Sequence, residues 1–486
     1  QNIVAAESIT AIGNTFAYSP ERLKRTADME MASGLNRFVI HTSVHQPLDD
    51  KKPGFSLGPF GQWFTRHETW AQQAKPWMDY LGRSSYLLQQ GRYVADVLYY
   101  YGENHNITST FAQSLPPVPA GYEYDFVNAS ALMDVIQAKD GQLVAPSGTT
   151  YNLLVLDESA RYMTLPVLKK IRDLVKAGVK VTGTKPEKSP SLADNDAEFQ
   201  ALVKEVWSSP NVSSQPIGEV LKAAGVREDV MIKDAEAEIL YVHRQTFGQD
   251  IYWLNNRSDS PNDAEVSFRA VGKVPELWNP VTGKTERVSY QIKDGRTVVP
   301  LHFDSWDAYF IVFKDKTTAT AYTKPTITEK PLLTISTPWR VRFQEDRGAP
   351  ASATFDKLTS LSENSEPGIK YFSGTATYQT TFDAPAASQG VVDLGDVKNI
   401  AEVYLNGKYQ GTVWKKPFRL ELADDLKKGT NTLEVRVTNL WVNRLIGDAQ
   451  PGTTQKITFT TMPFYQANAP LLPSGLLGPV RVFTTK

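Results

Sequence analysis

The sequence has 486 residues, enough for about three or four domains at roughly 150 residues each. Its 52 Lys and Arg residues balance 53 Asp and Glu residues, which argues against a strongly basic nucleic-acid-binding protein. Apolar residues make up 41% of the chain, so hydrophobic cores can form, and no apolar run approaches the roughly 18–20 residues that span a bilayer. We therefore expect a folded multidomain protein with no nucleic-acid or membrane partner.

Cysteine is absent, which excludes disulfides, thiol nucleophiles and zinc–thiolate sites. Aromatic residues reach 11%, a level that is common in carbohydrate-active proteins and in β-sandwiches alike. The chain starts at Gln1 without a Met or a signal peptide, and residues 2–6 already have the pattern of a buried strand. We therefore expect this chain to be part of a longer protein.

Residues 1–115 alternate strand and helix patterns. Strands are predicted at residues 3–6, 37–42 and 93–101, and helices at 20–33 and 71–90, the second interrupted at Pro76. This order predicts a parallel sheet with right-handed crossovers, which fits either part of a (β/α) barrel or an open sheet.

Three further units follow. Residues 116–235 continue as an α/β unit, with a boundary expected at the proline-rich stretch 115–119. Residues 236–325 give short alternating strands typical of a β-sandwich, and 316–330 reads as a linker. Residues 326–486 repeat the β pattern and predict a second sandwich or jelly roll.

Polar residues follow the predicted strands of the first unit. Glu7 ends the first strand, His41 and His45 flank the end of the second, and Glu103 and His105 follow the third. Because the carboxyl ends of parallel strands meet at one edge, we expect these side chains to converge. A carboxylate there is a candidate acid, base or nucleophile, although each residue taken alone also fits an ordinary structural role.

Tryptophans recur every seven residues at positions 63, 70 and 77. Trp70 and Trp77 would share one helical face and pack inside the protein, whereas Trp63, in the Gly-rich loop GPFGQWF, fits either sugar stacking or packing. The stretch 194–198 lacks the spacing of a calcium loop and fits helix capping better. No phosphate-binding glycine motif occurs in the middle α/β unit, which therefore reads as structural.

Several long blocks resemble the α-L-rhamnosidases of glycoside hydrolase family 106. AAESIT (5–10), ASGLNRFVIHTSVHQP (32–47) and residues 58–104 look like the later half of that family's catalytic region. LNNRSDS (254–260) and ELWNPVTGK (276–284) look like the sandwich that follows it. Residues 374–385, 401–422 and 431–448 resemble a sugar-binding-type jelly roll that is shared with glycoside hydrolase family 2.

The resemblance implies a fold and a chemistry. The fold would be multidomain, α/β plus all-β: the C-terminal part of a (β/α) barrel (1–115), a flavodoxin-like α/β domain (116–235), a β-sandwich (236–325) and a galactose-binding-like jelly roll (326–486). The family inverts anomeric configuration with two glutamates, which implies Glu7 as general base and an acid on the missing upstream part of the same enzyme. It also implies that His41, His45, Trp63 and Glu103 border the sugar pocket.

The implied partner is a rhamnose-containing oligosaccharide or polysaccharide, and the implied location is periplasmic or secreted. The residues require no cofactor, and the resemblance allows a calcium ion near the sugar hydroxyls without naming its ligands. Two other functions stay open on the sequence: a β-galactosidase-like glycosidase, and a non-catalytic sugar-binding or scaffold protein.

Overall fold

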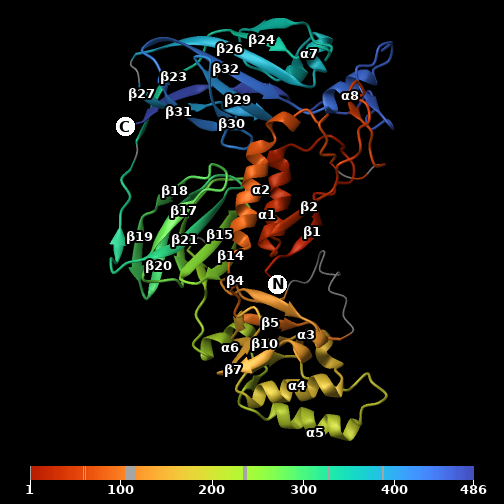
Figure 1. Ribbon diagram of the computed structural model, residues 1–486, viewed down its shortest axis with the longest axis vertical. Helices are drawn as coiled ribbons and strands as arrows, with labels where there is room; N and C mark the ends of the chain where they lie inside the picture. Colours follow the sequence, from red (N-terminus) through yellow and green to blue (C-terminus); the bar gives the residue numbers. More distant parts are fainter. Residues whose placement is uncertain are drawn as a thin grey trace.

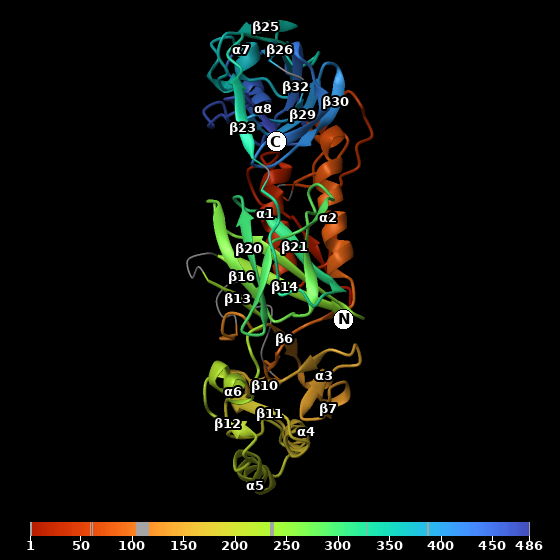
Figure 2. The same cartoon turned by 90° about the vertical axis from the view of Figure 1, so that its left-hand side faces the viewer.

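The computed structural model describes residues 2–58, 60, 62–103, 116–233, 238–326, 328–385 and 388–485. The molecule is elongated, with units stacked along its long axis (Figures 1 and 2). An all-β unit formed by the C-terminal third lies at one end and an α/β unit at the other, with the N-terminal unit and a β-sandwich between them. Within the described residues, no helix combines the length and apolar character that crossing a bilayer requires.

The N-terminal unit has a parallel β-α-β core, as the alternation of patterns predicts. Its elements are β1 (Ala5–Ser8), α1 (Pro20–Ala32), β2 (Arg37–Ile40), β3 (Pro53–Gly54) and α2 (Lys75–Leu88). Ser19 caps α1 by accepting a hydrogen bond from the Arg22 amide, and Pro20 supplies the fixed φ suited to a first helical residue. Pro76 stands in the first turn of α2, so the predicted interruption is instead the start of the helix.

A buried polar contact fixes α1 against its neighbours. Asp28 of α1 accepts hydrogen bonds from Lys24 Nζ (2.5 Å) and Tyr80 Oη of α2 (2.5 Å). Asp28 also accepts one from the Asn255 side chain (3.0 Å), which belongs to β15 (Gln249–Asn256) of the sandwich. Trp77 of α2 is fully buried in the same apolar cluster, as the seven-residue spacing predicts. The N-terminal unit is therefore anchored to the sandwich through α1.

The α/β unit is built on a sheet of parallel strands in the order β12-β11-β10-β5-β6. The strands are β5 (Val97–Tyr100), β6 (Tyr124–Val127), β10 (Leu153–Leu156), β11 (Lys180–Gly183) and β12 (Val212–Ser213), with β7 (Gln137–Lys139), β8 (Gln142–Val144) and β9 (Thr150–Tyr151) forming a small separate sheet. Its helices are α3 (Ala129–Asp134), α4 (Leu165–Lys176), α5 (Asp196–Trp207) and α6 (Ile217–Ala223). Leu168 and Ile171 of α4 are fully buried against the sheet, as the amphipathic pattern predicts.

The strand pairing places both boundaries of the α/β unit at other residues than the sequence predicts. β5, which the prediction assigned to the first unit, hydrogen-bonds on both sides with β10 and β6. Residues 116–119 lie between β5 and β6, so their prolines mark a loop inside the unit, since proline favours loops and linkers equally. β13 (Val230–Ile232), assigned to the α/β unit, instead pairs with β16 (Asn262–Phe268) of the sandwich.

The sandwich consists of two antiparallel sheets, as the alternating short strands predict. One has the order β13-β16-β20-β19-β22 and the other β18-β17-β21-β15-β14-β4. Its remaining strands are β4 (Arg92–Tyr93), β14 (Ile239–Thr246), β17 (Lys273–Trp278), β18 (Thr285–Arg287), β19 (Tyr290–Lys293), β20 (Arg296–Phe303), β21 (Ala308–Lys316) and β22 (Ala321–Tyr322). Tyr252 and Phe313 from one sheet pack on Phe268 from the other, with all three rings buried.

The C-terminal unit also packs two main sheets around one core. Their orders are β23-β35-β27-β31 and β25-β24-β26-β32-β29-β30, and β28 pairs with β34. The strands are β23 (Glu329–Thr334), β24 (Trp339–Phe343), β25 (Ser352–Phe355), β26 (Thr375–Ala384), β27 (Ser388–Asp393), β28 (Asp396–Lys398), β29 (Ile400–Leu405), β30 (Lys408–Val413), β31 (Arg419–Leu426), β32 (Gly429–Thr438), β33 (Phe459–Thr460), β34 (Gly475–Gly478) and β35 (Arg481–Thr485); α7 (Pro367–Lys370) and α8 (Val442–Asp448) are its helices. β33 pairs with β3, and Tyr465 Oη donates to the Thr15 carbonyl (2.6 Å), so this unit reaches the loops beside β1 and β2.

Candidate functional site

Glu7 and His41 come from the paired strands β1 and β2. The strands are parallel, with Glu7 opposite Val39, and the pairing extends to a hydrogen bond from the His41 amide to the Ser8 carbonyl (3.0 Å). The Glu7 carboxylate is exposed and accepts a hydrogen bond from the Thr10 hydroxyl (2.6 Å). The predicted convergence of these two residues at one sheet edge therefore occurs, because a parallel crossover brings both strand ends to the same side.

The two histidines at this edge differ in surroundings. His41 is half-buried, and its Nδ1 is buried without a hydrogen-bond partner in the described part of the protein. His45 is exposed in the following loop. An unpaired buried ring nitrogen is costly unless something engages it, so His41 is the stronger candidate to bind a polar ligand group.

Trp63 is a core residue, which makes the sugar-stacking alternative wrong. Its side chain is 1% exposed and packs between Phe16 and Phe464, at ring-centroid distances of 5.0 and 5.3 Å. The Gly-rich loop left open whether Trp63 stacks on a sugar or packs inside the protein. Thr42 exchanges backbone hydrogen bonds with Gln62 and Phe64, which turns Trp63 inward. A ring enclosed in this way cannot stack on a sugar.

Glu103 does not join the edge that carries Glu7. It follows β5, which belongs to the other sheet, and its carboxylate accepts hydrogen bonds from Thr164 N (2.6 Å) and Thr164 Oγ1 (2.9 Å). Thr164 is the residue at the start of α4, so the role of Glu103 is structural. The expectation failed because three strands in chain order were assumed to share one sheet. His105 lies outside the described residues.

Replacing Glu103 tests this assignment. Glu103→Ala should destabilise the α/β unit by about 1–2 kcal/mol, because it removes two hydrogen bonds to the start of α4. It should leave glycoside hydrolysis by the complete enzyme unchanged. Thermal unfolding and steady-state kinetics on the same preparation measure both effects. A large loss of kcat with unchanged stability would contradict the structural role and indicate that Glu103 contacts the sugar.

Glu68 is a buried carboxyl group in the stretch between Trp63 and α2, and it is not among the site residues predicted from the sequence. It is 4% exposed, and its oxygens accept hydrogen bonds from Gln62 Nε2 (2.7 Å) and the Thr69 amide (3.0 Å). Burial raises the pKa of Glu68 to about 7, against the smaller opposing effect of those hydrogen bonds. The neighbouring indole of Trp441 donates to the His67 carbonyl (2.8 Å), so this loop is locked against α8. No sequence pattern marks Glu68, because it is the fold of the loop that buries it.

The raised pKa of Glu68 makes stability depend on pH with a definite sign. The folded protein binds this proton more tightly than the unfolded chain, so the stabilisation is complete below pH 4.5 and is lost as pH rises to about 7. Glu68→Gln removes the charge, so at pH 8 the variant should be more stable than the natural chain by about 1–3 kcal/mol. Unfolding measured at pH 5 and pH 8 tests this, with the exposed Glu219→Gln as control. A stability difference between Glu68→Gln and the natural chain that is the same at both pH values would contradict the assignment.

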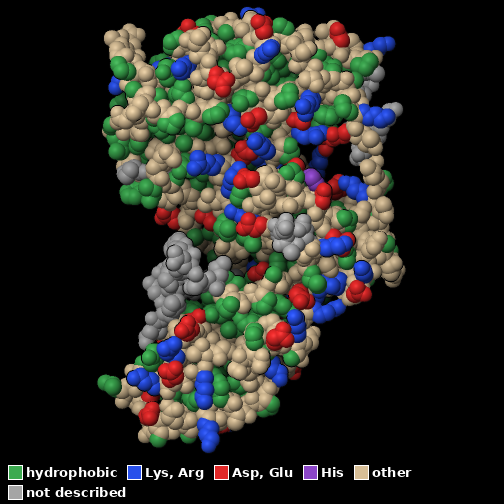
Figure 3. Space-filling model, turned by 180° about the vertical axis from the view of Figure 1, so that it is seen from behind, with side chains coloured by type: hydrophobic (Ala, Val, Ile, Leu, Met, Phe, Trp, Pro, Cys, Tyr) green, Lys and Arg blue, Asp and Glu red, His purple; other side chains and the backbone are tan. Residues whose placement is uncertain are grey.

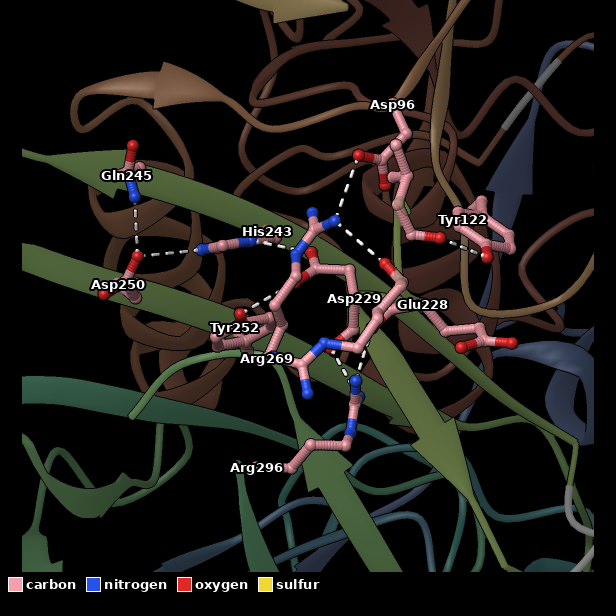
Figure 4. Close-up of polar contacts among 12 residues, drawn as sticks. Asp96, Tyr122, Glu228, Asp229, His243, Gln245, Asp250, Tyr252, Arg269 and Arg296 are labelled. Atoms are coloured by element: carbon pink, nitrogen blue, oxygen red, sulfur yellow. Dashed lines mark hydrogen bonds and ion pairs between the residues drawn. The ribbon is translucent and has the colours of Figure 1, made fainter. Parts of the chain in front are cut away.

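A second polar cluster joins the α/β unit to the sandwich (Figure 4). We call it the junction network, and its members are Asp96, Asp229, His243, Asp250, Tyr252 and Arg269. Arg269 lies between Asp96 (3.0 Å) and Asp229 (3.4 Å). The His243 ring lies between Asp229 (Nδ1, 2.7 Å) and Asp250 (Nε2, 3.3 Å). Asp229 also accepts a hydrogen bond from Tyr252 Oη (2.9 Å).

Charge pairing overcomes the effect of burial on the pKa values of Asp229 and His243. Burial alone would raise the pKa of Asp229, yet attraction to His243 and the hydrogen bond from its ring hold that pKa below the ordinary value. Burial alone would lower the pKa of His243, yet the Asp229 and Asp250 carboxylates raise it. His243 is 3% exposed and both its ring nitrogens are engaged, so the Asp–His–Asp arrangement is not positioned to meet a substrate. The junction network is structural.

The capping prediction for the stretch 194–198 also has an outcome. Asn195 accepts a hydrogen bond from the Glu198 amide (2.9 Å) and Asp194 accepts one from the Leu165 amide (2.7 Å), so the capping interpretation of the 194–198 stretch is confirmed. No group of three or more His, Asp or Glu side chains that could hold a metal ion occurs within the described residues.

Comparison with known proteins agrees with the resemblance of the sequence blocks. The model of glycoside hydrolase family 106, described as alpha-L-rhamnosidase, matches residues 1–292, more than half of the chain. A solved rhamnosidase structure from Novosphingobium sp. PP1Y is 44% identical, with a TM-score of 0.94 over 100% of this chain and 48% of that chain. A curated protein of Formosa agariphila, named "Putative beta-glucuronidase", is 27% identical over 736 residues, covering 99% of this chain and 63% of that protein.

These similarities extend over the whole of the chain but not over the whole of the relatives. The chain spans 48% of the solved rhamnosidase and 63% of the curated protein. The range that matches the family model begins at the first residue of the chain. It includes β1 with Glu7, β2, the α/β unit and part of the sandwich. The chain belongs to glycoside hydrolase family 106, the α-L-rhamnosidases.

Proposed function

We propose that the complete protein removes terminal α-L-rhamnose from an oligosaccharide or polysaccharide by an inverting mechanism, with Glu7 as general base. The observation that carries the proposal is the exposed Glu7 carboxylate on β1, held by Thr10 beside the end of the parallel strand β2. Family membership and a 44% identical rhamnosidase support the substrate class.

The chemistry requires two carboxyl groups. An inverting glycosidase uses one carboxylate to deprotonate water and one carboxylic acid to protonate the leaving oxygen, about 6.5–9.5 Å apart. Glu7 is suited to the first role because its carboxyl group is open to water. We assign the acid to a segment that precedes this chain, because residues 5–104 resemble the later half of the family's catalytic region and the chain covers 48% of the solved rhamnosidase.

The remaining parts of the fold follow from the same proposal. We infer that β1, α1 and β2 complete a (β/α) barrel whose other strands belong to that preceding segment. We further infer that the C-terminal unit is a jelly roll of the sugar-binding type. His41, with its buried unpaired Nδ1, and His45 then contact the sugar hydroxyls, whereas Trp63 and Glu103 do not.

A substrate panel on the complete enzyme tests the proposal. Aryl α-L-rhamnoside should be hydrolysed with release of β-L-rhamnose as the first product, which NMR detects before mutarotation. The panel also contains an aryl β-glucuronide, chosen because of the curated relative's name, and an aryl β-galactoside. Cleavage of either of these without cleavage of the rhamnoside would overturn the substrate assignment. Sugar binding without any hydrolysis would favour a scaffold protein.

A further inference from the structure

A cavity of about 580 Å³ opens at the carboxyl edge of the sheet in the α/β unit, remote in sequence from Glu7. Tyr101, Asp157, Thr184 and Gln215 line it, and each follows the end of a different strand: β5, β10, β11 and β12. The volume falls within the range of about 300–1,000 Å³ that is common for small-molecule sites. The cavity therefore has the size and the strand-end composition of a ligand site.

The cavity also lies where ligands bind in open α/β sheets. From β5 the chain passes to β6 on one side of the sheet and later returns to β10 on the other side. The order of the strands reverses between β5 and β10, and the crevice outside their carboxyl ends is the favoured binding position in this class of fold. Tyr99 and Tyr101 from the end of β5 and Asp157 from the end of β10 stand at that point.

The polar groups of the cavity are held in fixed positions. Asp157 accepts hydrogen bonds from Tyr99 Oη (2.6 Å) and the Ser159 amide (2.9 Å). Thr182 Oγ1 donates to the Gln215 carbonyl (2.8 Å), which ties the end of β11 to the loop after β12. Gly183 adopts a positive φ of +112°, and a Cβ there would lie 2.2 Å from the Leu156 carbonyl oxygen, so only glycine fits between β10 and β11. The site is therefore organised before any ligand arrives.

The lining selects against anionic ligands. Its charged side chains are Asp157 and Glu158, and no Lys, Arg or His is among the residues that line it in the described structure. Among the described lining residues, a phosphate or a uronate would meet two carboxyl side chains and no cationic one. The unit also lacks a glycine-rich phosphate loop. Nucleotides and acidic sugars are thus disfavoured.

The same lining suits a neutral sugar. Tyr101 and Phe126 line the cavity with half-buried rings that pack edge to face, 6.1 Å apart, and aromatic rings can pack on the C–H groups of a pyranose. Asp157, Thr184 and Gln215 also line the cavity, and their side chains are of the kinds that hydrogen-bond sugar hydroxyls. We propose that this cavity is a second, non-catalytic saccharide site that binds a neutral monosaccharide unit. It goes beyond the proposed hydrolysis, since it would hold a sugar residue away from the scissile bond.

Direct binding to the 486-residue chain tests the proposal. Methyl α-L-rhamnoside, methyl β-D-galactoside and methyl β-D-glucoside are titrated separately by calorimetry, with galacturonic acid and AMP as anionic controls. At least one neutral glycoside should bind saturably, and the anions should not. Hydrogen exchange with and without that glycoside should show protection of the peptides containing residues 99–101, 155–158 and 182–184.

Variants then locate the site. Tyr101→Ala should weaken binding about tenfold, equivalent to about 1.4 kcal/mol, and Thr184→Trp should abolish it by filling the cavity. Tyr162→Ala, an exposed tyrosine of the same unit, serves as matched control and should bind normally. Glu7→Gln should also bind normally, which separates this site from the catalytic one. Absence of binding by every neutral glycoside, binding unaffected by Thr184→Trp, or binding of AMP instead would each overturn the proposal.

Discussion

Glu7→Gln in the complete enzyme should lower kcat for an aryl rhamnoside on the order of 10³-fold with little change in KM. Glutamine has the same shape and can still accept the hydrogen bond from Thr10, but it cannot take a proton from water. Glu7 is exposed in the 486-residue chain, so the same substitution there should change the free energy of unfolding by less than about 0.5 kcal/mol. Steady-state kinetics and thermal unfolding measure the two effects separately.

The leaving group distinguishes the role of base from that of acid. A rhamnoside with a good leaving group needs little protonation, so it would restore activity to an enzyme that lacks its acid. It should not restore activity to Glu7→Gln, because water still has no base. Glu198→Gln, an exposed glutamate of α5, is the control and should retain full activity. Near-normal kcat in Glu7→Gln would refute the assignment.

The second large effect is expected in the junction network. Asp229→Ala should destabilise the contact between the α/β unit and the sandwich by about 3–5 kcal/mol, because Arg269 and His243 lose a buried partner. Hydrogen exchange in β14 and β15, which carry His243 and Asp250, should rise accordingly. Catalytic constants measured at a temperature where the variant is folded should stay unchanged.

The chain offers a matched control for Asp229. Asp263 pairs with His302 at the same 2.7 Å, but both side chains are largely exposed, at 89% and 59%. Asp263→Ala should therefore cost less than about 1 kcal/mol, since surface ion pairs are weak in water. Equal effects of the two substitutions would show that burial does not set the strength of the junction network.

Local patterns predicted the elements well because short-range physics fixes them. Ser19 and Pro20 mark the start of α1, and the alternation of residues 239–313 predicts the sandwich strands. The partner of β5 was not predictable in this way. A buried parallel strand is apolar on both faces, so its sequence carries little information about which strand lies beside it. Because β5 pairs with β10 and β6 and not with β1 or β2, Glu103 does not lie at the sheet edge that carries Glu7.

The sequence by itself determined the family, the α/β and all-β parts of the chain, and the place of Glu7 and His41 near the ends of adjacent parallel strands. Each of these depends on local periodicity, on capping or on long sequence blocks. Only the tertiary structure decided the burial of Trp63 and Glu68, the junction network around Asp229, and the cavity at Asp157. The physical reason is that burial and ion pairing depend on residues far apart in the chain, and no local pattern encodes which of them will meet.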